Sequence, residues 1–463
     1  MIFMVIRLFD RHSIFVCVCI MAVVIAVTMA FNLGSKNRTA PNSEASQSAS
    51  SKTESIGSAS SSPLESFADF SQPVSENTGA SAAAPSSGTA VSSQTAAVSA
   101  AASGEMRAVW VPYMSLDMSR EEDKSEKAFQ KKFDAIIVNA KKCNMNTLIV
   151  HVRPFGDALY KSSYYPWSHT VGGTQGVNPG YDPLAYMVSA SHKAGLKIHA
   201  WVNPLRVQIA STPSILAQEN PYNTWINDTS KPGWVVESGS GKYYNPAYTQ
   251  VRRLIADGAK EIAKNYEVDG IQFDDYFYPT QDAAFDKAAY DNYRSSAQKN
   301  GTPLSLQEWR RANVNALVSL VYSEIKSAKP GVVFGIAPQG NVQNDMNLGA
   351  DVVSWCGTQG YVDYICPQLY VNFENPVLPY DTAVQSWRKL VTNKNIKLYF
   401  GLAVYKAGSD ADSGTWKKSD TILAQQVSLG RKTPCDGFMF YSADYLSSSQ
   451  TKEEIQNVMK VLN

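Results

Sequence analysis

The sequence has almost no net charge and few residues suited to binding metals. Its 42 lysines and arginines balance 41 aspartates and glutamates, which leaves a formal net charge of +1 over 463 residues. Because charges of both signs are interspersed, no basic surface of the kind that binds nucleic acid is indicated. The five histidines show no metal-ligand spacing. We therefore expect no nucleic-acid partner, no metal and no other cofactor.

Cysteine is also scarce. Four of the six cysteines belong to the part of the chain that can build a core, namely Cys143, Cys356, Cys366 and Cys435. Their spacing matches neither a CxxC zinc pattern nor a dense disulfide framework. Buried free thiols are the favoured interpretation, and a disulfide is the alternative.

Residues 1–33 have the pattern of an export segment. Residues 1–12 carry Arg7 and Arg11, which favours a short cytoplasmic N-terminus. Residues 13–33 contain an uncharged apolar run from Ile14 to Phe31. That run fits either a signal peptide, with cleavage after Ala30, or a signal-anchor helix in the membrane. Both interpretations place the rest of the chain on the extracellular side of the membrane or in the cell wall, secreted or membrane-anchored.

Residues 34–104 contain hardly any large apolar side chains and consist mainly of Ser, Ala, Thr, Gly and Pro. Such a segment cannot bury enough surface to offset the entropy lost on ordering. We expect a disordered tether here. Residues 105–463 then form the remaining domain, whose length is normal for an α/β barrel with insertions.

Within this domain, strand-like apolar runs alternate with amphipathic helical patterns. Eight runs lie at residues 107–113, 147–153, 197–203, 270–276, 332–339, 363–370, 398–405 and 437–442. Apolar residues at helical spacing fill the intervals, as at 125–143, 248–266 and 306–331. This alternation predicts an α/β fold, a (β/α)8 TIM barrel with its active site at the C-terminal ends of the strands. An open doubly wound sheet is less favoured, because no glycine-rich phosphate loop follows the first strand.

Side chains that follow each other in a strand face opposite ways. Aliphatic residues such as Leu148, Val150 and Val152 share one face, and we expect them to pack on the helices. The opposite face becomes polar near the C-terminal strand ends, at Arg153, Asn203, Asp274, Gln339, Gln368, Tyr370, Tyr405 and Tyr441. So many polar residues at one mouth predict a polar ligand site. A hydrogen-bonded core network is the alternative.

Long aromatic connections follow the third and fourth strands. The connection after residue 203 includes Trp225, Trp234, Tyr243 and Tyr244, and the second runs from Tyr276 to about residue 304. Loops of this length in a compact domain are usually functional. We expect aromatic walls of a saccharide cleft. The alternative is a hydrophobic cluster that serves stability alone.

Six stretches together resemble the glycosyl-hydrolase-like family 10, first catalogued as domain of unknown function 187. They are EMRAVWVPY, IVHVRPFGDALYKSSYYPWS, HAWVNPLRV, DGIQFDDYFYP, FGIAPQGN and DYICPQLY, and the resemblance covers residues 105–463 in order. It implies a TIM-barrel glycoside hydrolase of the bacterial cell envelope. A characterised branch of that family cleaves the glycan backbone of peptidoglycan strands that have lost their stem peptides.

Glycoside hydrolysis usually needs two carboxyl groups. Asp274 is the first candidate, because it shares the inward strand face with Gln272. Asp275 points the other way unless the strand bends. If it points away, it orients Asp274 or bonds a neighbouring loop. The second functional carboxylate can equally be Asp157 or Glu374, with Asp157 preferred to Glu374. If the two adjacent aspartates stay close, like-charge repulsion raises one pKa, which suits an acid.

A comparison with chitinase-type barrels leaves the mechanism open. Those barrels end the fourth strand in D-G-x-D-x-D-x-E; here Asp269, Gly270 and Asp274 fit, but Gln272 and Tyr276 replace the second aspartate and the glutamate. A simple transfer of the chitinase acid therefore fails. A substrate-assisted reaction through an N-acetyl group, positioned by Asp274, is one alternative, and a metal-binding role of the aspartate pair is another.

The sequence thus predicts an exported or membrane-anchored glycoside hydrolase that cleaves a cell-envelope polysaccharide, with peptidoglycan glycan favoured. Its alternative is a catalytically silent carbohydrate-binding barrel at the cell surface. The membrane is a partner if the N-terminal helix is uncleaved. The catalytic candidates are Asp274, Asp275 and Asp157. The residues expected to bind substrate are Arg153, Trp201, Asn203, Arg206, Tyr276, Tyr278, Gln339, Asn341, Gln368, Tyr370, Glu374, Tyr405 and Tyr441.

Overall fold

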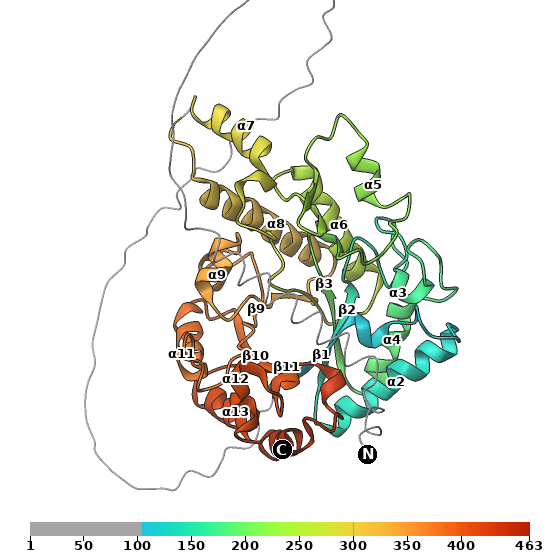
Figure 1. Ribbon diagram of the computed structural model, residues 1–463, viewed down its shortest axis with the longest axis vertical. Coiled ribbons are helices and arrows are strands. Elements are labelled where there is room, and N and C mark those ends of the chain that lie inside the picture. The colour runs from blue at the N-terminus through green and yellow to red at the C-terminus, as the bar shows by residue number, and fades with distance from the viewer. Residues whose placement is uncertain (1–103, 300) are drawn as a thin grey trace, which may run out of the picture. The chain divides into compact units, whose positions relative to one another are not determined.

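The computed structural model describes residues 104–299 and 301–463. Parallel strands close into a barrel in the hydrogen-bonded order β1-β11-β10-β9-β8-β7-β3-β2, and helices surround it (Figure 1). The strands are β1 (Met106–Val111), β2 (Thr147–Arg153), β3 (Lys197–Val202), β7 (Gly270–Phe273), β8 (Val333–Ile336), β9 (Tyr364–Ile365), β10 (Lys397–Ala403) and β11 (Gly437–Tyr441). All eight predicted strands are present, which confirms the TIM barrel.

The three helical patterns noted in the sequence are confirmed as α2 (Glu126–Lys142), α6 (Thr249–Asn265) and α8 (Leu306–Ala328). Ser305 begins α8 with a capping box, because its hydroxyl accepts from the Glu308 amide and the Glu308 side chain accepts from the Ser305 amide. The other helices that cover the barrel include α4 (Pro183–Lys193), α11 (Tyr380–Leu390), α13 (Ile422–Lys432) and α14 (Lys452–Leu462).

The predictions for residues 1–12, 13–33 and 34–103 lie outside the described residues. Within residues 104–299 and 301–463, no helix has both the length and the apolar character needed to cross a bilayer. The four cysteines of this region are free, with Cys143, Cys356 and Cys366 buried. The expectation of free thiols is confirmed for this part of the chain, although Cys435 is only half-buried.

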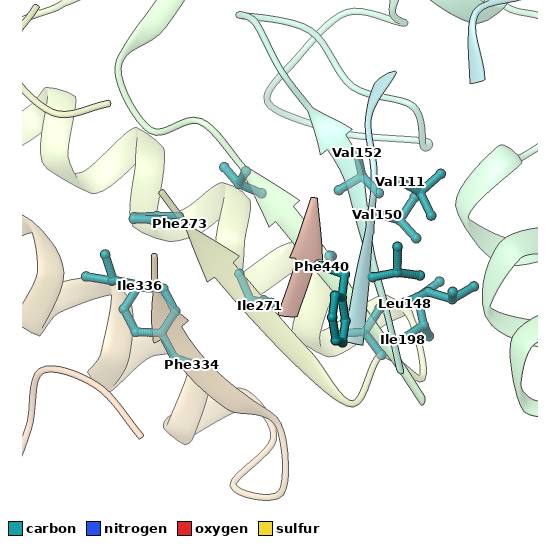
Figure 2. Close-up of a cluster of buried hydrophobic side chains, with 14 of the residues drawn as sticks. Val111, Leu148, Val150, Val152, Ile198, Ile271, Phe273, Phe334, Ile336 and Phe440 are labelled. Atoms are coloured by element: carbon teal, nitrogen blue, oxygen red, sulfur yellow. The ribbon is translucent and has the colours of Figure 1, made fainter. Parts of the chain in front are cut away.

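The two faces of the barrel strands separate as the alternation predicts. Leu148, Val150 and Val152 point outward and belong to a large apolar core that includes helix residues such as Phe129, and Figure 2 shows this outward set across several strands. A separate cluster inside the barrel contains Trp110, Ile149, Trp201, Tyr364 and Met439. Apolar burial on the outer face therefore holds the helices to the barrel.

Below the mouth, the barrel interior carries a hydrogen-bonded network. The Trp110 indole donates to Gln272 Oε1 at 2.7 Å, and Gln272 Nε2 donates to the Tyr364 hydroxyl at 3.2 Å. The Tyr364 hydroxyl also lies 3.0 Å from His199 Nδ1, and burial lowers the pKa of His199 to about 4, which keeps it neutral. A Cβ on Gly335 would lie 2.1 Å from the Tyr364 ring, so only glycine fits beside it. This network contains none of the polar residues predicted at the strand ends, so it is separate from the mouth and does not account for those residues.

The long connection after β3 folds into a small antiparallel sheet of its own. Its strands β4 (Arg206–Ile209), β5 (Val235–Ser238) and β6 (Gly241–Tyr244) pair in the order β4-β6-β5, next to the short helix α5 (Pro221–Ile226). Trp225 packs against Trp234 and Tyr244, with ring centroids 5.2 and 5.8 Å away. These aromatic side chains stabilise the insertion and line neither hollow described below. The expectation that they form a cleft wall is wrong.

A buried ion pair fixes the connection after β7, which leads to helix α7 (Lys287–Ala297). Arg310 donates to both carboxylate oxygens of Asp286, at 2.6 and 3.0 Å, and also to the Asp282 carbonyl at 2.7 Å. The side chains of Arg310 and Asp286 are 3% and 0% exposed. The guanidinium lies over the Tyr278 ring, 4.8 Å from its centroid. This pair therefore holds the segment that directly follows the two adjacent aspartates.

We predict that Arg310→Leu lowers the free energy of unfolding by about 3–5 kcal/mol, because it leaves Asp286 buried without its partner. Denaturant unfolding of the purified chain measures the change. Lys287→Met, which removes the cation of an exposed i,i+4 pair with Asp291, is the control and should change the value by less than about 0.5 kcal/mol. Equal effects of both variants would contradict a structural role of the buried pair.

Candidate active site

A hollow of about 390 Å³ lies at the C-terminal mouth of the barrel, and we call it the mouth pocket. Every barrel strand, or the turn that follows it, contributes at least one side chain. Its lining residues are Trp110, Tyr113, Met114, His151, Trp201, Arg206, Asp274, Asp275, Tyr276, Ala337, Gln368, Tyr370, Tyr405 and Tyr441. The volume is in the range of ordinary ligand pockets, and its position is that of TIM-barrel active sites.

The two adjacent aspartates both line this pocket. Strand β7 ends at Phe273, so the alternation of strand side chains does not extend to the next two residues. Asp274 accepts from the Tyr276 amide at 3.1 Å, and Asp275 accepts from Gln368 Nε2 at 2.8 Å. The sequence predicts that Asp275 points away unless the strand bends. The strand ends at Phe273 and the chain bends at Asp275, so the exception applies.

Their surroundings give the two carboxyls different proton affinities. Burial raises the pKa of Asp274 well above its ordinary value, and the charge of Asp275 adds to this, whereas Arg206 lowers it. Burial also raises the pKa of Asp275, but hydrogen bonds from Gln368 and Gln339 oppose the rise. Asp274 is consequently the better proton holder of the two, and the hydrogen bonds to Asp275 favour its carboxylate form. The expected repulsion is present, although burial is the larger cause.

Arg206 is the cation of the mouth pocket, and the turn after β3 aims it there. Asn203 Oδ1 accepts from the Arg206 amide at 2.9 Å, and Arg206 Nε donates to the Pro154 carbonyl at 2.9 Å. The guanidinium lies 4.9 Å from the centroid of the Phe155 ring and 5.0 Å from that of Tyr276. Such contacts favour one orientation of a planar cation.

Aromatic rings form the pocket walls. Tyr370, Tyr405 and Tyr441 contact one another with centroid distances of 5.9 to 6.1 Å. On the other side, Trp201 stacks on His151 at 3.7 Å. Burial lowers the pKa of His151 well below its ordinary value, so this ring is neutral. Aromatic faces with hydroxyls at their edges suit sugar rings, which present apolar faces and polar rims.

A second hollow of about 520 Å³ continues from the mouth pocket, and we call it the amide groove. The two share Asp275, Gln368 and Tyr370. The rest of the amide groove is lined by Gln339, Gly340, Asn341, Asn344, Val371, Asn375, Val377 and Leu378. Asp275 therefore lies where two arms of one cleft meet, and Asp274 lies on the side of the mouth pocket.

The structure brings together most of the predicted site residues. Those in the mouth pocket are Trp201, Arg206, Asp274, Asp275, Tyr276, Gln368, Tyr370, Tyr405 and Tyr441, and those in the amide groove include Gln339 and Asn341. Neither hollow is lined by Arg153, Asp157, Asn203, Tyr278 or Glu374. These five side chains lie elsewhere in the structure and make other contacts.

Arg153 lies outside the mouth because a bulge shifts the β2–β3 pairing between His151 and Arg153. Its guanidinium carbon lies 4.3 Å above the ring of Tyr165, which belongs to the outer core. The prediction that Arg153 faces the site is wrong for this reason. A bulge shifts every later side chain of its strand relative to the pleat.

Asp157 is completely buried, but in the loop after β2 rather than in the cleft. It accepts from Gln175 Nε2 at 2.9 Å, and it lies 3.1 Å from His169 Nδ1. Its contacts hold the loop together and leave it no position beside Asp274. The expectation that Asp157 is the second catalytic carboxylate is therefore wrong.

The other three displaced residues have structural roles. Asn203 shapes the turn that aims Arg206. Tyr278 is buried between Arg310 and Phe285, with a centroid distance of 5.5 Å to the latter ring. Glu374 is exposed and pairs with Lys418. We conclude that Asn203 positions a pocket residue and that Tyr278 and Glu374 lie outside the cleft.

The sequence reasoning missed Trp110, Tyr113, Met114, His151 and Ala337. Two of them had a signal: Trp110 and His151 follow Ala108 and Ile149 at the inward spacing of their strands, and each is a large polar or aromatic residue near a strand end. Asp345 was also missed. It is buried, and it accepts from the Gln339 amide at 2.9 Å, which fixes the backbone beside Asp275.

The metal-binding alternative for the aspartate pair gains no support from the structure. In residues 104–299 and 301–463, no three His, Cys, Asp or Glu side chains are grouped so that they could hold a metal ion.

The barrel is similar in fold to solved glycoside hydrolases. The PgaB (BpsB) glycoside hydrolase domain from Bordetella bronchiseptica matches with a TM-score of 0.50 and 15% identity, over 77% of this chain and 99% of that one. The catalytic domain of β-amylase from Paenibacillus polymyxa matches with a TM-score of 0.50 and 12% identity, over 78% and 100%. The class of protein is thus a TIM barrel with the fold of glycoside hydrolases.

Sequence similarity defines the family. The glycosyl hydrolase-like 10 family matches residues 105–417. Glycosyl hydrolase YngK of Bacillus subtilis (strain 168) is 34% identical over 349 residues, covering 71% of this chain and 66%, just under two thirds, of the relative. Glycosyl hydrolase DigH of Escherichia coli (strain K12) is 32% identical over 372 residues, covering 75% and 82%. The chain belongs to the glycosyl hydrolase-like 10 family, which confirms the resemblance noted in its motifs and, at the level of the family, the glycoside hydrolase class. Membership implies a polysaccharide substrate.

We predict that Asp274→Asn raises the melting temperature at neutral pH by on the order of 2 °C. The pKa of Asp274 is raised on folding, so its contribution to stability is complete below the unfolded value and is lost as pH rises through the folded value. The neutral amide avoids that loss. Thermal unfolding at neutral pH and near pH 3 measures the difference, which should vanish at the lower pH.

The matched control is Asp410→Asn, which changes an exposed aspartate that lines neither hollow. Its melting temperature should follow the parent protein at both pH values. A stabilisation by Asp274→Asn that is the same at both pH values would contradict the raised pKa as its cause.

Proposed function

We propose that the protein is an exported glycoside hydrolase that cleaves glycosidic bonds of a cell-envelope N-acetylhexosamine polymer, with peptidoglycan glycan as the substrate. The observation that carries this proposal is the adjacent pair of carboxyls that both line the mouth pocket in different surroundings. Burial and the charge of Asp275 raise the pKa of Asp274 well above its ordinary value, whereas hydrogen bonds from Gln368 and Gln339 oppose the rise at Asp275. A carboxyl that keeps its proton more readily, beside one that loses it more readily, suits glycoside hydrolysis.

In the proposed reaction, Asp274 acts as the general acid. Its proton passes to the glycosidic oxygen as the bond between that oxygen and the anomeric carbon breaks, and the leaving sugar departs as an alcohol. Asp275 stabilises the positive charge that develops on the sugar ring or on its N-acetyl group. Water then completes hydrolysis at the anomeric carbon and returns a proton to Asp274. Gln368 keeps Asp275 in place during these steps through its 2.8 Å hydrogen bond.

The pocket walls support a sugar substrate. Tyr370, Tyr405 and Tyr441 offer ring faces for stacking, and their hydroxyls reach toward a bound ligand's polar rim. Trp201 closes the opposite side. This mixture of aromatic faces and few polar groups is typical of sites that orient a carbohydrate.

The export part of the proposal rests on residues 13–33 and 34–104, whose composition fits a signal or anchor segment followed by a tether. We expect a C-terminally tagged chain to be found in the membrane or extracellular fraction of a bacterial host. Deletion of residues 1–33 should leave the tagged chain in the cytoplasm. A cytoplasmic location of the intact chain would contradict the proposal.

A catalytically silent carbohydrate-binding barrel is the second candidate, because stacking rings and polar groups bind sugars whether or not a bond is cleaved. The two candidates differ in one observable, the release of new reducing ends. Binding of the glycan by the protein without such release would favour the silent barrel.

We predict that Asp274→Asn and Asp275→Asn each lower kcat on peptide-free peptidoglycan glycan by about 10²- to 10⁴-fold, because each removes a carboxyl that acts in the transition state. Reducing-end release over a pH series is the measurement. In the parent protein the rate should fall as pH rises through the raised pKa of Asp274, since the acid then loses its proton.

Glu374→Gln is the matched control, since it removes a carboxylate that lies outside both hollows. Its rate should equal that of the parent protein. Product masses that show anhydro-sugar ends rather than added water would show a lytic reaction in place of hydrolysis.

A further inference from the structure

The cleft is not uniform, because its two arms differ in charge. Both arms meet at Asp275, Gln368 and Tyr370. On one side of this junction, the mouth pocket contains the cation Arg206. On the other side, the amide groove contains no charged side chain besides Asp275 itself. A polymer that crosses the junction therefore meets a positively charged arm and an uncharged one.

Arg206 is half-buried, and it has no aspartate or glutamate of residues 104–299 and 301–463 within ion-pair distance. Its recorded side-chain hydrogen bond uses Nε, which donates to the Pro154 carbonyl at 2.9 Å. The contacts with the Phe155 and Tyr276 rings fix the orientation of the guanidinium group. The terminal nitrogens of an arginine form a fork that matches a carboxylate. Arg206 is thus a pre-oriented cation in a pocket wall.

The aspartate pair does not saturate this cation. Arg206 lowers the pKa of Asp274 and that of Asp275, but in both cases other causes are larger. Asp275 is hydrogen-bonded to Gln368 instead, and Asp274 accepts from the Tyr276 amide. The terminal nitrogens of Arg206 therefore remain available to a carboxylate on the substrate, which would pair with the guanidinium directly.

The amide groove suits a different sugar. Gln339, Asn341, Asn344 and Asn375 supply amide groups that both donate and accept hydrogen bonds. Asn341 uses its carbonyl oxygen to cap helix α9 (Val342–Asn347), which leaves its NH₂ as a donor. Hydroxyl and N-acetyl groups pair with such side chains, whereas a sugar carboxylate would find no cation there.

We propose that the cleft binds a glycan across the aspartate pair with an acid-bearing sugar in the mouth pocket, its carboxylate paired with Arg206, and an uncharged sugar in the amide groove. This inference rests on the proposed hydrolase function and goes beyond it by naming the residue that recognises the acidic sugar and the arm of the cleft in which that sugar lies.

The competing explanation is that Arg206 acts only on the aspartate pair. In that case its removal slows every substrate by the same factor. If Arg206 binds a substrate carboxylate, its removal slows the acidic substrate more than a neutral one. The two explanations therefore differ in a ratio of rates, which does not depend on how much of a variant is active.

The experiment uses the full chain and two probes, peptide-free peptidoglycan glycan and the same glycan with its carboxylates chemically reduced to alcohols. We expect kcat/KM of the parent protein to be roughly 10- to 100-fold higher on the acidic glycan, the range of a charge-assisted hydrogen bond. Arg206→Gln should abolish this preference, and Arg206→Lys should keep part of it. Lys242→Gln, which changes a half-buried cation on the same small sheet that lines neither hollow, should keep all of it.

Binding of short, non-cleaved fragments of both glycans to Asp274→Asn, followed by tryptophan fluorescence, is a second readout. An affinity preference that depends on Arg206, without any hydrolysis by the parent protein, would support the inference and refute the hydrolase function. Three results would overturn the inference: no preference in the parent protein, an unchanged preference in Arg206→Gln, or the same loss on both glycans.

Discussion

The removal of Asp274 from water, next to a second carboxylate, is the constraint around which the rest of the site is arranged. An isolated carboxylate is strongly disfavoured in such a position. Burial raises the pKa of Asp274 and so favours its neutral form, Gln368 donates a hydrogen bond to Asp275, and the charge of Arg206 lowers the pKa of both carboxyls. The large apolar core between the barrel and the helices stabilises the fold and so offsets this local cost.

The fold could be predicted because its signals are periodic. The outward aliphatic set on β2, with Leu148, Val150 and Val152, appears in the sequence as strict alternation, and the helices α2, α6 and α8 appear as apolar residues at helical spacing. Closure of the strands into a barrel follows from their number and their connections. Even the polar mouth followed from counting which strand ends carried Asp274, Gln368 and the three tyrosines.

The parts of the site that could not be predicted depend on breaks in those periods. A bulge after His151 turns Arg153 into the outer core, and the end of β7 at Phe273 turns Asp275 into the pocket. Neither break leaves a mark such as glycine or proline at the residue concerned. The role of the aromatic residues in the insertion could not be predicted either. Aromatic residues such as Trp225 and Trp234 occur both in the wall of a sugar-binding cleft and in a small hydrophobic core, so the sequence does not distinguish the two.

The small sheet after β3 has a consequence for how specificity can change. The aspartate pair follows a barrel strand, whereas Arg206 begins the first strand of an insertion that folds around its own aromatic cluster. Chemistry and charge preference are therefore carried by separate stretches of chain, which meet where Arg206 contacts the ring of Tyr276. A lineage could exchange the insertion, and with it the kind of sugar that is accepted, while the machinery that breaks the bond stays untouched.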